Sequence, residues 1–427
     1  MKKIFIILLL LIITGVIAPK FIGSVVETEH QSGVNKLNEN PAITINSTTF
    51  TRQWFTGQAT TEVTIVLQDE GIEDITLIVE EDLSFGPVIF KDGDFVFGLS
   101  YSQANINFKE LFIDEEIETF INDKIHLSAL LTFSKNIVSK VVIDEVSKEV
   151  DGNTVTSAKA VGKFTIEDSR RLYGNFNWDG LAAKTNEENF TLGKMKFSLD
   201  QTLIAGDYYQ GNAISTGEFH FSMDSVVAKD STDNTAFALN NLLVKAVSDL
   251  DDDLMGITMN YSADEIETAG QKLENANLDI VISRLNFIVM QEINTFMASL
   301  PIDDEAMFTP DKMEELSLLV QKLLVDGPVI DVKDFSVKTA EGKIESSMQV
   351  SVDDKLFDTT DIMSIVPAIK VDAKGKAPMS FFTKLGMAPM VDMYVDQGFV
   401  ILNENELSVK INFVQGTLEI NDKVIPM

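Results

Sequence analysis

Few residues of this 427-residue chain could carry chemistry. It has three histidines (His30, His126 and His220) and no cysteine. The lack of thiols excludes disulfides, thiolate metal sites and cysteine nucleophiles. His126 and His220 each stand between apolar residues of an alternating run. We therefore expect both side chains on the solvent face of a strand, as surface residues and not as metal ligands.

The acidic residues and glycines also form no recognisable site. The cluster "SDLDDDL" (248–254) lacks the spacing, the central glycine and the final glutamate of a calcium loop, so it predicts a solvated turn. Neighbouring acids such as Glu80 and Glu81 point to opposite faces of a strand and cannot share one proton-transfer site. "KGKAP" (374–378) lacks the upstream glycine of a phosphate loop. We assign no catalytic, cofactor-binding or metal-binding residue and expect a protein that is not an enzyme.

Charge narrows the choice of partners. Acidic residues outnumber basic ones by 66 to 34, which gives a net charge of −32. A chain this acidic repels phosphate backbones, so we expect no nucleic-acid partner.

The first 22 residues differ from the rest. Lys2 and Lys3 precede an uncharged stretch from Ile4 to Ala18. Its length suits a signal peptide, but Pro19 follows the best cleavage position, and snorkelling of Lys20 would extend the segment to the minimum length for a membrane span. We expect an uncleaved signal anchor, with a cleaved signal peptide as the alternative. The two lysines place the N-terminus in the cytoplasm and the bulk of the chain outside it.

Alternation with period two dominates most of the remaining sequence and predicts half-buried antiparallel strands. "EFHFSMD" puts Phe219, Phe221 and Met223 on one face, and "DFVFGLSY" does the same from Phe95 to Tyr101. We expect a β-rich α+β fold with a large antiparallel sheet. The predicted division is a membrane segment (1–22), a linker (23–41), an antiparallel β lobe (42–265) and a smaller α+β lobe (266–427).

Helices are expected mainly in the C-terminal lobe. "NFIVMQEINTFMASL" (286–300) reads as one, and a second runs from Pro310 to Val325, with Thr309 as its cap. A third is expected over 377–396. The apolar surface of the helix expected at 310–325 is broader than contact with one sheet face would require. Leu318, Leu319 and Leu324, which flank its main stripe, are therefore a candidate interface, either between the two lobes or with a second copy of the chain. Simple packing within one chain is the alternative.

The tetrapeptide Gly-Pro-Val-Ile occurs twice, at 86–89 and 327–330. In both places glycine allows a sharp turn, proline stops the preceding element, and the β-branched pair suits the start of a strand. We interpret it as a turn-to-strand connection and not as a ligand loop.

Several motifs together resemble a known family. They are the lysine-flanked apolar N-terminus, "FTRQWFTGQ" (50–58), "FGPV", the helix leading into "DGPVIDVKDFSVKTAEGKIESSMQV", and "LSVKINFVQGTLEINDKVI" (407–425). The chain resembles the YdgA-like bacterial envelope proteins, a family of unknown biochemical function. The resemblance implies an inner-membrane-anchored periplasmic protein that self-associates, and it supplies no catalytic residue. Here Gln53 replaces a glycine of the usual aromatic-x-Arg-Gly pattern.

We therefore expect an anchored, non-catalytic envelope protein that acts by binding or assembly, without a cofactor. The alternative is a carrier that holds a lipid or another hydrophobic ligand in a groove on the apolar face of the sheet. The most distinctive local motif is Arg52, Trp54 and Phe55, for which we expect a packed aromatic and an arginine paired with an acid.

Overall fold

The computed structural model describes residues 17–66, 74–91, 93–109, 124–150, 152–185, 188–268, 270–298, 300 and 309–426. Most of the first segment, 1–16, lies outside this range. None of the described helices combines the length and the apolar character needed to cross a membrane.

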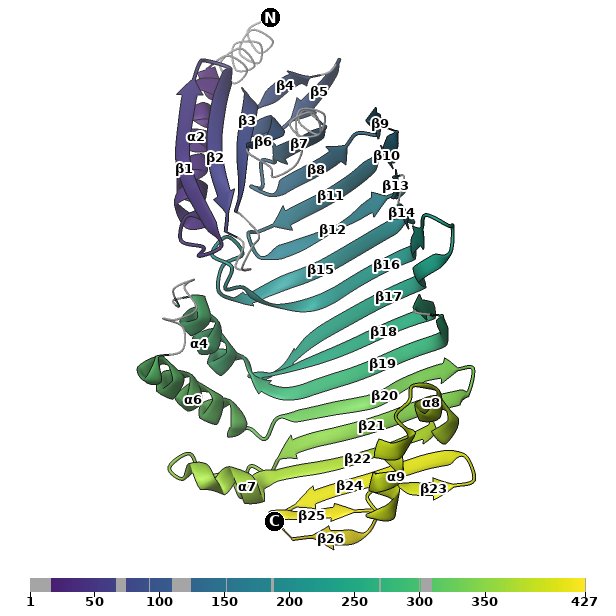
Figure 1. The fold of residues 1–427 in the computed structure, drawn as a ribbon. Helices are drawn as coiled ribbons and strands as arrows, with labels where there is room; N and C mark the ends of the chain where they lie inside the picture. Colours follow the sequence, from purple (N-terminus) through teal and green to yellow (C-terminus); the bar gives the residue numbers. More distant parts are fainter. Residues whose placement is uncertain are drawn as a thin grey trace, which may run out of the picture.

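One antiparallel sheet dominates the described residues, with 24 of the strands in it. In Figure 1 it runs as a continuous band from the N-terminal end at the top to the C-terminus at the bottom. Nearly every strand pairs with its neighbour in sequence, as expected where polar turns separate alternating runs. The predicted β-rich fold with a large antiparallel sheet is confirmed.

The N-terminal third begins with helix α2 and continues as a meander. The pairing order is β1–β2–β3–β6–β7–β8, and β4 and β5 form a separate hairpin. The elements are α2 (Ala18–Leu37), β1 (Ile43–Arg52), β2 (Thr56–Ile65), β3 (Ile75–Phe85), β4 (Val88–Lys91), β5 (Asp94–Phe97), β6 (Ser100–Lys109), β7 (Ile125–Leu131) and β8 (Ile137–Ile143).

In the middle of the sheet, a line of breaks interrupts four consecutive strands at the same register. Each long strand is divided into two short ones. On one side of the breaks the pairing order is β9–β10–β13–β14, and on the other it is β8–β11–β12–β15; both β14 and β15 then pair with β16. Ion pairs line these breaks, with Lys159 Nζ 3.5 Å from Asp144 Oδ1 and Lys194 Nζ 2.8 Å from Asp179 Oδ1. The strands are β9 (Val146–Val150), β10 (Asn153–Ser157), β11 (Ala160–Glu167), β12 (Arg171–Trp178), β13 (Leu181–Lys184), β14 (Glu188–Leu192), β15 (Met195–Ala205) and β16 (Ile214–Asp230).

The sheet continues without interruption into the C-terminal part, in the order β16–β17–β18–β19–β20–β21–β22–β24–β25–β26, with β23 also on β24. The lobe boundary expected at 265/266 falls inside β18, whose pairing with β19 runs on both sides of it. The strands are β17 (Thr235–Asp251), β18 (Leu254–Thr268), β19 (Gln271–Asn286), β20 (Val329–Thr339), β21 (Gly342–Val352), β22 (Ile369–Pro378), β23 (Ile401–Asn403), β24 (Glu406–Val414), β25 (Thr417–Ile420) and β26 (Lys423–Ile425).

Helices interrupt this C-terminal part at three places. The pair α4 and α6 stands between β19 and β20, a short helical segment precedes β22, and α8 and α9 follow it. Their bounds are α4 (Phe287–Ala298), α6 (Pro310–Leu324), η2 (Ile362–Ser364), α7 (Ile365–Ala368), α8 (Met379–Lys384) and α9 (Ala388–Asp396). The helices expected at 286–300 and 310–325 are confirmed.

Three local expectations need correction. The stretch expected to be a linker, 23–41, is helical through Leu37, because α2 finds an apolar surface to pack on. The expected helix 377–396 starts as the end of β22 and then breaks between α8 and α9 at Gly386, whose φ of 74° no helix continues. The run Phe95–Tyr101 is not one strand, since β5 ends at Phe97 in the separate β4–β5 hairpin and β6 of the main sheet starts at Ser100.

Two glycines explain why the β4–β5 hairpin is separate from the main sheet. A Cβ on Gly86 would lie 1.7 Å from the carbonyl oxygen of Gly98, so the two backbones meet at a distance that only glycine permits. Gly86 and Pro87 therefore end β3 and start the β4–β5 hairpin, while Gly327 and Pro328 connect α6 to β20. The turn-to-strand interpretation of the repeated tetrapeptide is confirmed.

Candidate functional site: a continuous apolar face

One face of the sheet is apolar over most of its length. A cross-strand row starts at Phe176 of β12 and passes through Phe197, Phe221, Val244, Tyr261, Leu278 and Phe335, one residue on each successive strand. A parallel row runs through Leu199, Phe219, Ala246, Met259, Ile280, Val332, Met348, Ala373, Ile411 and Ile420. We call this surface the apolar face.

Aromatic rings stack along the start of this face. Phe197 lies with its ring centroid 5.7 Å from Phe164, 5.4 Å from Phe176 and 6.4 Å from Phe219. Gly162 and Gly174 lie beside them, and a Cβ at either position would approach the Phe164 ring to within 3 Å. The glycines thus make room for rings that lie flat across neighbouring strands.

The first row continues toward the N-terminus through Gly162, Val141, Leu127 and Ala104, and helix α2 covers the apolar face only at this N-terminal end. Val26 of α2 is buried together with Ala59, Leu83 and Phe85 of the sheet. His30 of the same helix places its Nε2 3.3 Å from Oε2 of Glu81, which occupies the apolar face between Ala59 and Ala104. A carboxylate on this side of the sheet therefore has a partner supplied by the helix.

The middle of the apolar face is half exposed. Phe164, Phe176, Phe197, Phe219 and Phe221 are all partly accessible, unlike the residues under α2. Further along the face, Tyr261 is 36 % exposed and Phe335 is 46 % exposed. Strands β11 to β21 therefore present a broad apolar surface to solvent, although isolated exposed apolar side chains would need no explanation.

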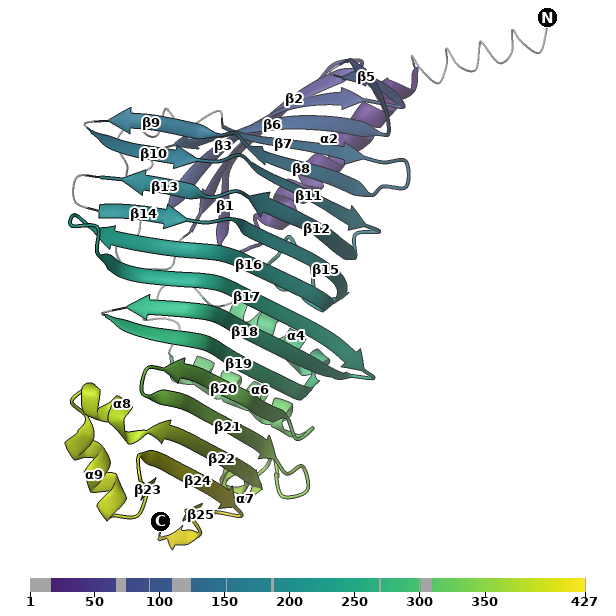
Figure 2. The ribbon, with the colours of Figure 1, turned by 90° about the vertical axis from the view of Figure 1, so that its right-hand side faces the viewer.

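Helices α4 and α6 lie on the same side of the sheet as α2 but cover little of it. Figure 1 shows α4 and α6 to the left of the sheet and α2 at the upper left behind β1 and β2, and Figure 2, turned by 90°, shows all three helices behind most of the strands. Phe296 of α4 and Leu319 of α6 form one buried cluster together with Leu300, which follows α4 in the chain. Together α4 and α6 form a helical hairpin that stands beside the apolar face.

This arrangement separates the three leucines of the candidate interface. Leu319 is 9 % exposed and belongs to the contact between α4 and α6, whereas Leu318 is 53 % exposed and Leu324 is half-buried. Leu318, together with Ile288 and Phe296, lines a shallow pocket on the hairpin. The sequence identified the excess of apolar residues, but not that α4 would bury one of the three.

The opposite face of the sheet is polar and carries ion pairs between side chains of neighbouring strands. Arg171 donates two hydrogen bonds to Asp200, at 2.9 and 2.7 Å. Both pKa values move away from neutrality: the hydrogen bond and charge of Asp200 raise the pKa of Arg171, and the same bond lowers the pKa of Asp200. Pairs of this kind are solvated surface contacts, and the shifts of Arg171 and Asp200 move both pKa values away from the neutral range that acid–base catalysis uses.

His126 and His220 lie on the polar face and are accessible to solvent, as expected. Side chains of His126 and His220 are 42 % and 41 % exposed, and His126 binds Asn105 and Asp144 through its two ring nitrogens. Among the described residues, no group of three or more histidine, cysteine, aspartate or glutamate side chains could hold a metal ion.

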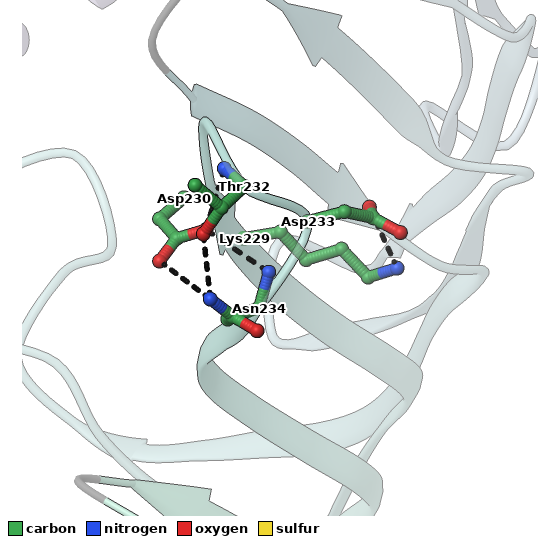
Figure 3. Close-up of polar contacts among 5 residues, drawn as sticks. All are labelled: Lys229, Asp230, Thr232, Asp233 and Asn234. Atoms are coloured by element: carbon green, nitrogen blue, oxygen red, sulfur yellow. Dashed lines mark hydrogen bonds and ion pairs between the residues drawn. The ribbon is translucent and has the colours of Figure 1, made fainter.

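A further polar cluster belongs to the turn between β16 and β17. Figure 3 shows Asp230 at the end of β16 with one carboxylate oxygen accepting bonds from the backbone and hydroxyl of Thr232 and from the backbone of Asn234, at 2.8, 2.7 and 3.0 Å. These bonds, that of the Thr232 hydroxyl first, lower the pKa of Asp230. Its other oxygen accepts the amide of Asn234 at 3.4 Å. The cluster shapes the β16–β17 connection and offers no ligand site.

The motif Arg52, Trp54 and Phe55 lies at the β1–β2 turn. Nε of Arg52 donates to Glu27 and its Nη1 donates to the carbonyl of Lys20, both at 3.0 Å. Nζ of Lys20 lies 5.0 Å from the Trp54 ring centroid. The arginine thus pairs with an acid as expected and fixes the start of α2, but the aromatic side chains are not packed inside: Trp54 is 44 % exposed and Phe55 is 49 % exposed.

Comparison with known proteins places the chain in a family without giving it an activity. The model of the family described as "Bacterial protein of unknown function (DUF945)" matches residues 1–427. No curated protein and no solved structure matches the chain. The description does not include the YdgA-like name, so that resemblance stays a prediction.

Proposed function

The chain belongs to this bacterial family of unknown function, and we propose that it is a non-catalytic binding protein of the cell envelope, whose apolar face holds a hydrophobic ligand. The observation that carries the proposal is the half-exposed row of apolar side chains from Phe176 to Phe335, on a sheet whose other face is polar. An apolar surface this extensive costs free energy in water until something covers it.

The shape of the molecule favours a slender ligand over a second copy of the chain. Helix α2 and the α4–α6 hairpin both rise on the side of the apolar face (Figures 1 and 2). A second sheet of the same length would meet these helices before it reached the middle of the face. An acyl chain or a similar molecule can lie across the strands between them. The second copy is the runner-up, since the resemblance implies self-association.

The envelope location belongs to the same proposal. It is supported by the sequence of residues 1–22, where two lysines precede an uncharged stretch. Lipids and other hydrophobic molecules are abundant next to a membrane. A binding protein for them would operate there without any nucleophile or metal.

The proposal is tested with a fluorescent fatty-acid analogue and two variants of strand β15. Phe197→Asp puts a charge in the centre of the aromatic stack, and Ser198→Asp puts the same charge on the opposite face. We expect saturable binding that Phe197→Asp weakens about tenfold or more, because burying an unpaired carboxylate opposes binding, while Ser198→Asp leaves it unchanged.

Equal binding by both variants, or no saturable binding by the wild type, would refute the proposal. Light scattering tests the alternative that the chain associates with itself. A wild-type dimer that Phe197→Asp converts to a monomer would mean that a second copy covers the apolar face.

A further inference from the structure

The β4–β5 hairpin exposes more aromatic surface than any packing role explains. Val88, Phe90, Phe95 and Phe97 all point to its outer side and are 48 %, 65 %, 66 % and 63 % exposed. They form two cross-strand pairs, Val88 with Phe97 and Phe90 with Phe95. On the inner side Ile89 is 2 % exposed. The hairpin is therefore apolar on both sides, although only its inner side packs against the protein.

The outer side chains also support each other. The rings of Phe90 and Phe95 are 5.2 Å apart between centroids and tilted by 56°. A two-stranded hairpin is marginal by itself, and three exposed phenylalanines add an unfavourable hydration term. A surface element with these properties is suited to contact something apolar.

Backbone hydrogen bonds hold the hairpin beside two other groups of exposed aromatics. The N–H of Gly86 donates to Leu99 at 2.7 Å, and the N–H of Phe85 donates to the carbonyl of Phe55 at 2.8 Å. The β1–β2 turn, with Trp54 and Phe55, therefore lies next to the base of the hairpin. The first turns of α2, tied to this turn through Arg52 and Lys20, add Phe21, which is 67 % exposed.

These residues define an aromatic end patch at the N-terminal end of the sheet, which comprises Phe21, Trp54, Phe55, Phe90, Phe95 and Phe97. In Figure 1 the start of α2, the β1–β2 turn and the β4–β5 hairpin all lie at the top, where the described chain begins. Figure 2 shows the same end from the side, with β5 and the start of α2 both at the top.

We propose that the aromatic end patch rests on the surface of a lipid bilayer, with its rings at the level of the head groups. Two observations favour lipid over a protein partner. The described chain begins at this end with Ile17, and the residues that precede it in the sequence, from Ile4 to Val16, carry no charge. Lys20 beside Trp54 also gives the patch an aromatic ring and a cation of the kind that settles at bilayer interfaces.

This contact would orient the molecule. The strands follow one another away from the patch, so the C-terminal strands β24 to β26 are remote from the bilayer (Figure 1). The inference does not depend on ligand binding by the apolar face. If both hold, the apolar face extends outward from the membrane surface.

The test uses single-tryptophan versions of the full chain bound to phosphatidylethanolamine–phosphatidylglycerol vesicles that contain brominated phosphatidylcholine. Trp54 and Trp178 are the two native tryptophans, and both are replaced by phenylalanine. One protein then carries Phe95→Trp on the patch. The matched control carries Val424→Trp on β26, where the native side chain is 62 % exposed, close to the 66 % of Phe95.

We expect the bromolipid to quench tryptophan 95 strongly and to shift its emission to the blue, with no change at position 424. Quenching at position 95 should fall by at least half when Phe90→Ser and Phe97→Ser are added, because the patch loses two of its rings; circular dichroism checks that these proteins stay folded.

Three results would overturn the proposal. They are no quenching at position 95 in vesicle-bound protein, equal quenching at positions 95 and 424, and a blue-shifted tryptophan 95 before any lipid is added. The last result, together with a dimer mass by light scattering, would mean that another protein surface covers the patch.

Discussion

Two regions of one cross-strand row, its N-terminal end and its middle, meet different environments. Under α2 the row contains Ala59 and Ala104, which are 3 % and 6 % exposed. Twelve or more strands of the same sheet then follow the same alternation, yet Phe176 and Phe197 on that row are only half-buried. The alternating pattern of side chains continues along the sheet, whereas α2 covers only its N-terminal end. Among the described residues no helix lies over this open part of the face, which is why we propose a ligand for it; the small residues under α2 show what a covered part looks like.

The largest effect should come from truncating a ring in each region. Phe85→Ala removes a side chain that is 2 % exposed and leaves a cavity under α2, so we expect a loss of about 3–5 kcal/mol in the free energy of unfolding. Phe176→Ala, on the open part, should cost about 1–2 kcal/mol because much of its ring already contacts water. Urea unfolding of both variants checks this. Equal losses would mean that the middle of the face is as well packed as the end.

The fit of α2 on the sheet can be probed with two glycines of the helix. A Cβ on Gly23 would lie 2.8 Å from the buried Phe85 ring, whereas a Cβ on Gly33 would meet nothing within 4 Å. Gly33→Ala should therefore stabilise the protein by about 0.5–1 kcal/mol through helix propensity. Gly23→Ala should instead destabilise it by about 1 kcal/mol or more.

Thermal unfolding of the two alanine variants measures the difference. A stabilising Gly23→Ala would show that α2 is not seated on Phe85.

The smallest effect concerns the contact between the end of α2 and the β15–β16 connection. Lys36 Nζ lies 2.9 Å from Asp207 Oδ2. Burial opposes ionisation of Asp207, but hydrogen bonds from Lys36 and from the N–H of Tyr209 outweigh it, so its pKa is lowered; the hydrogen bond and charge of Asp207 raise the pKa of Lys36. The contribution of the pair is thus complete between the two unfolded pKa values, roughly pH 4 to 10.

It is lost as the pH falls through the lowered pKa of Asp207 or rises through the raised pKa of Lys36. Asp207→Asn should cost about 0.5–1 kcal/mol at pH 7, since Lys36 is largely solvated, and should flatten the acid limb of stability against pH. A variant whose unfolding keeps the wild-type acid limb would show that another carboxylate dominates there.

The alternation of apolar and polar residues was sufficient to predict much of the fold. The Phe219–Met223 run told both that β16 is a strand and which side chains share a face, because a strand's period is two. Gly86, Gly327 and their prolines marked the connections for an equally local reason. Helix α2 was not predicted, because its apolar residues are few and because its packing depends on Ala59 and Leu83, which are distant in sequence.

The candidate site was predicted only as an alternative. Periodicity shows which residues of a strand share a face, but not whether a helix lies on that face. The open part of the face could therefore be recognised only once α2 and the α4–α6 hairpin had positions. Exposure of Trp54 and Phe55 was missed for a related reason, since an aromatic cluster in sequence looks the same whether it points inward or outward.

The most direct test of an open, ligand-binding face uses the absence of cysteine from this chain. Val244→Cys places a single thiol on the apolar face of β17, and Lys245→Cys places one on the polar face of the same strand. Maleimide labelling is followed with and without a short-chain phosphatidylcholine, held below its micelle-forming concentration. We predict that both thiols react without lipid. At a lipid concentration about ten times the dissociation constant, labelling of residue 244 should slow about tenfold while residue 245 is unaffected. A residue 244 that is unreactive from the start, or that reacts equally fast with lipid, would contradict the account.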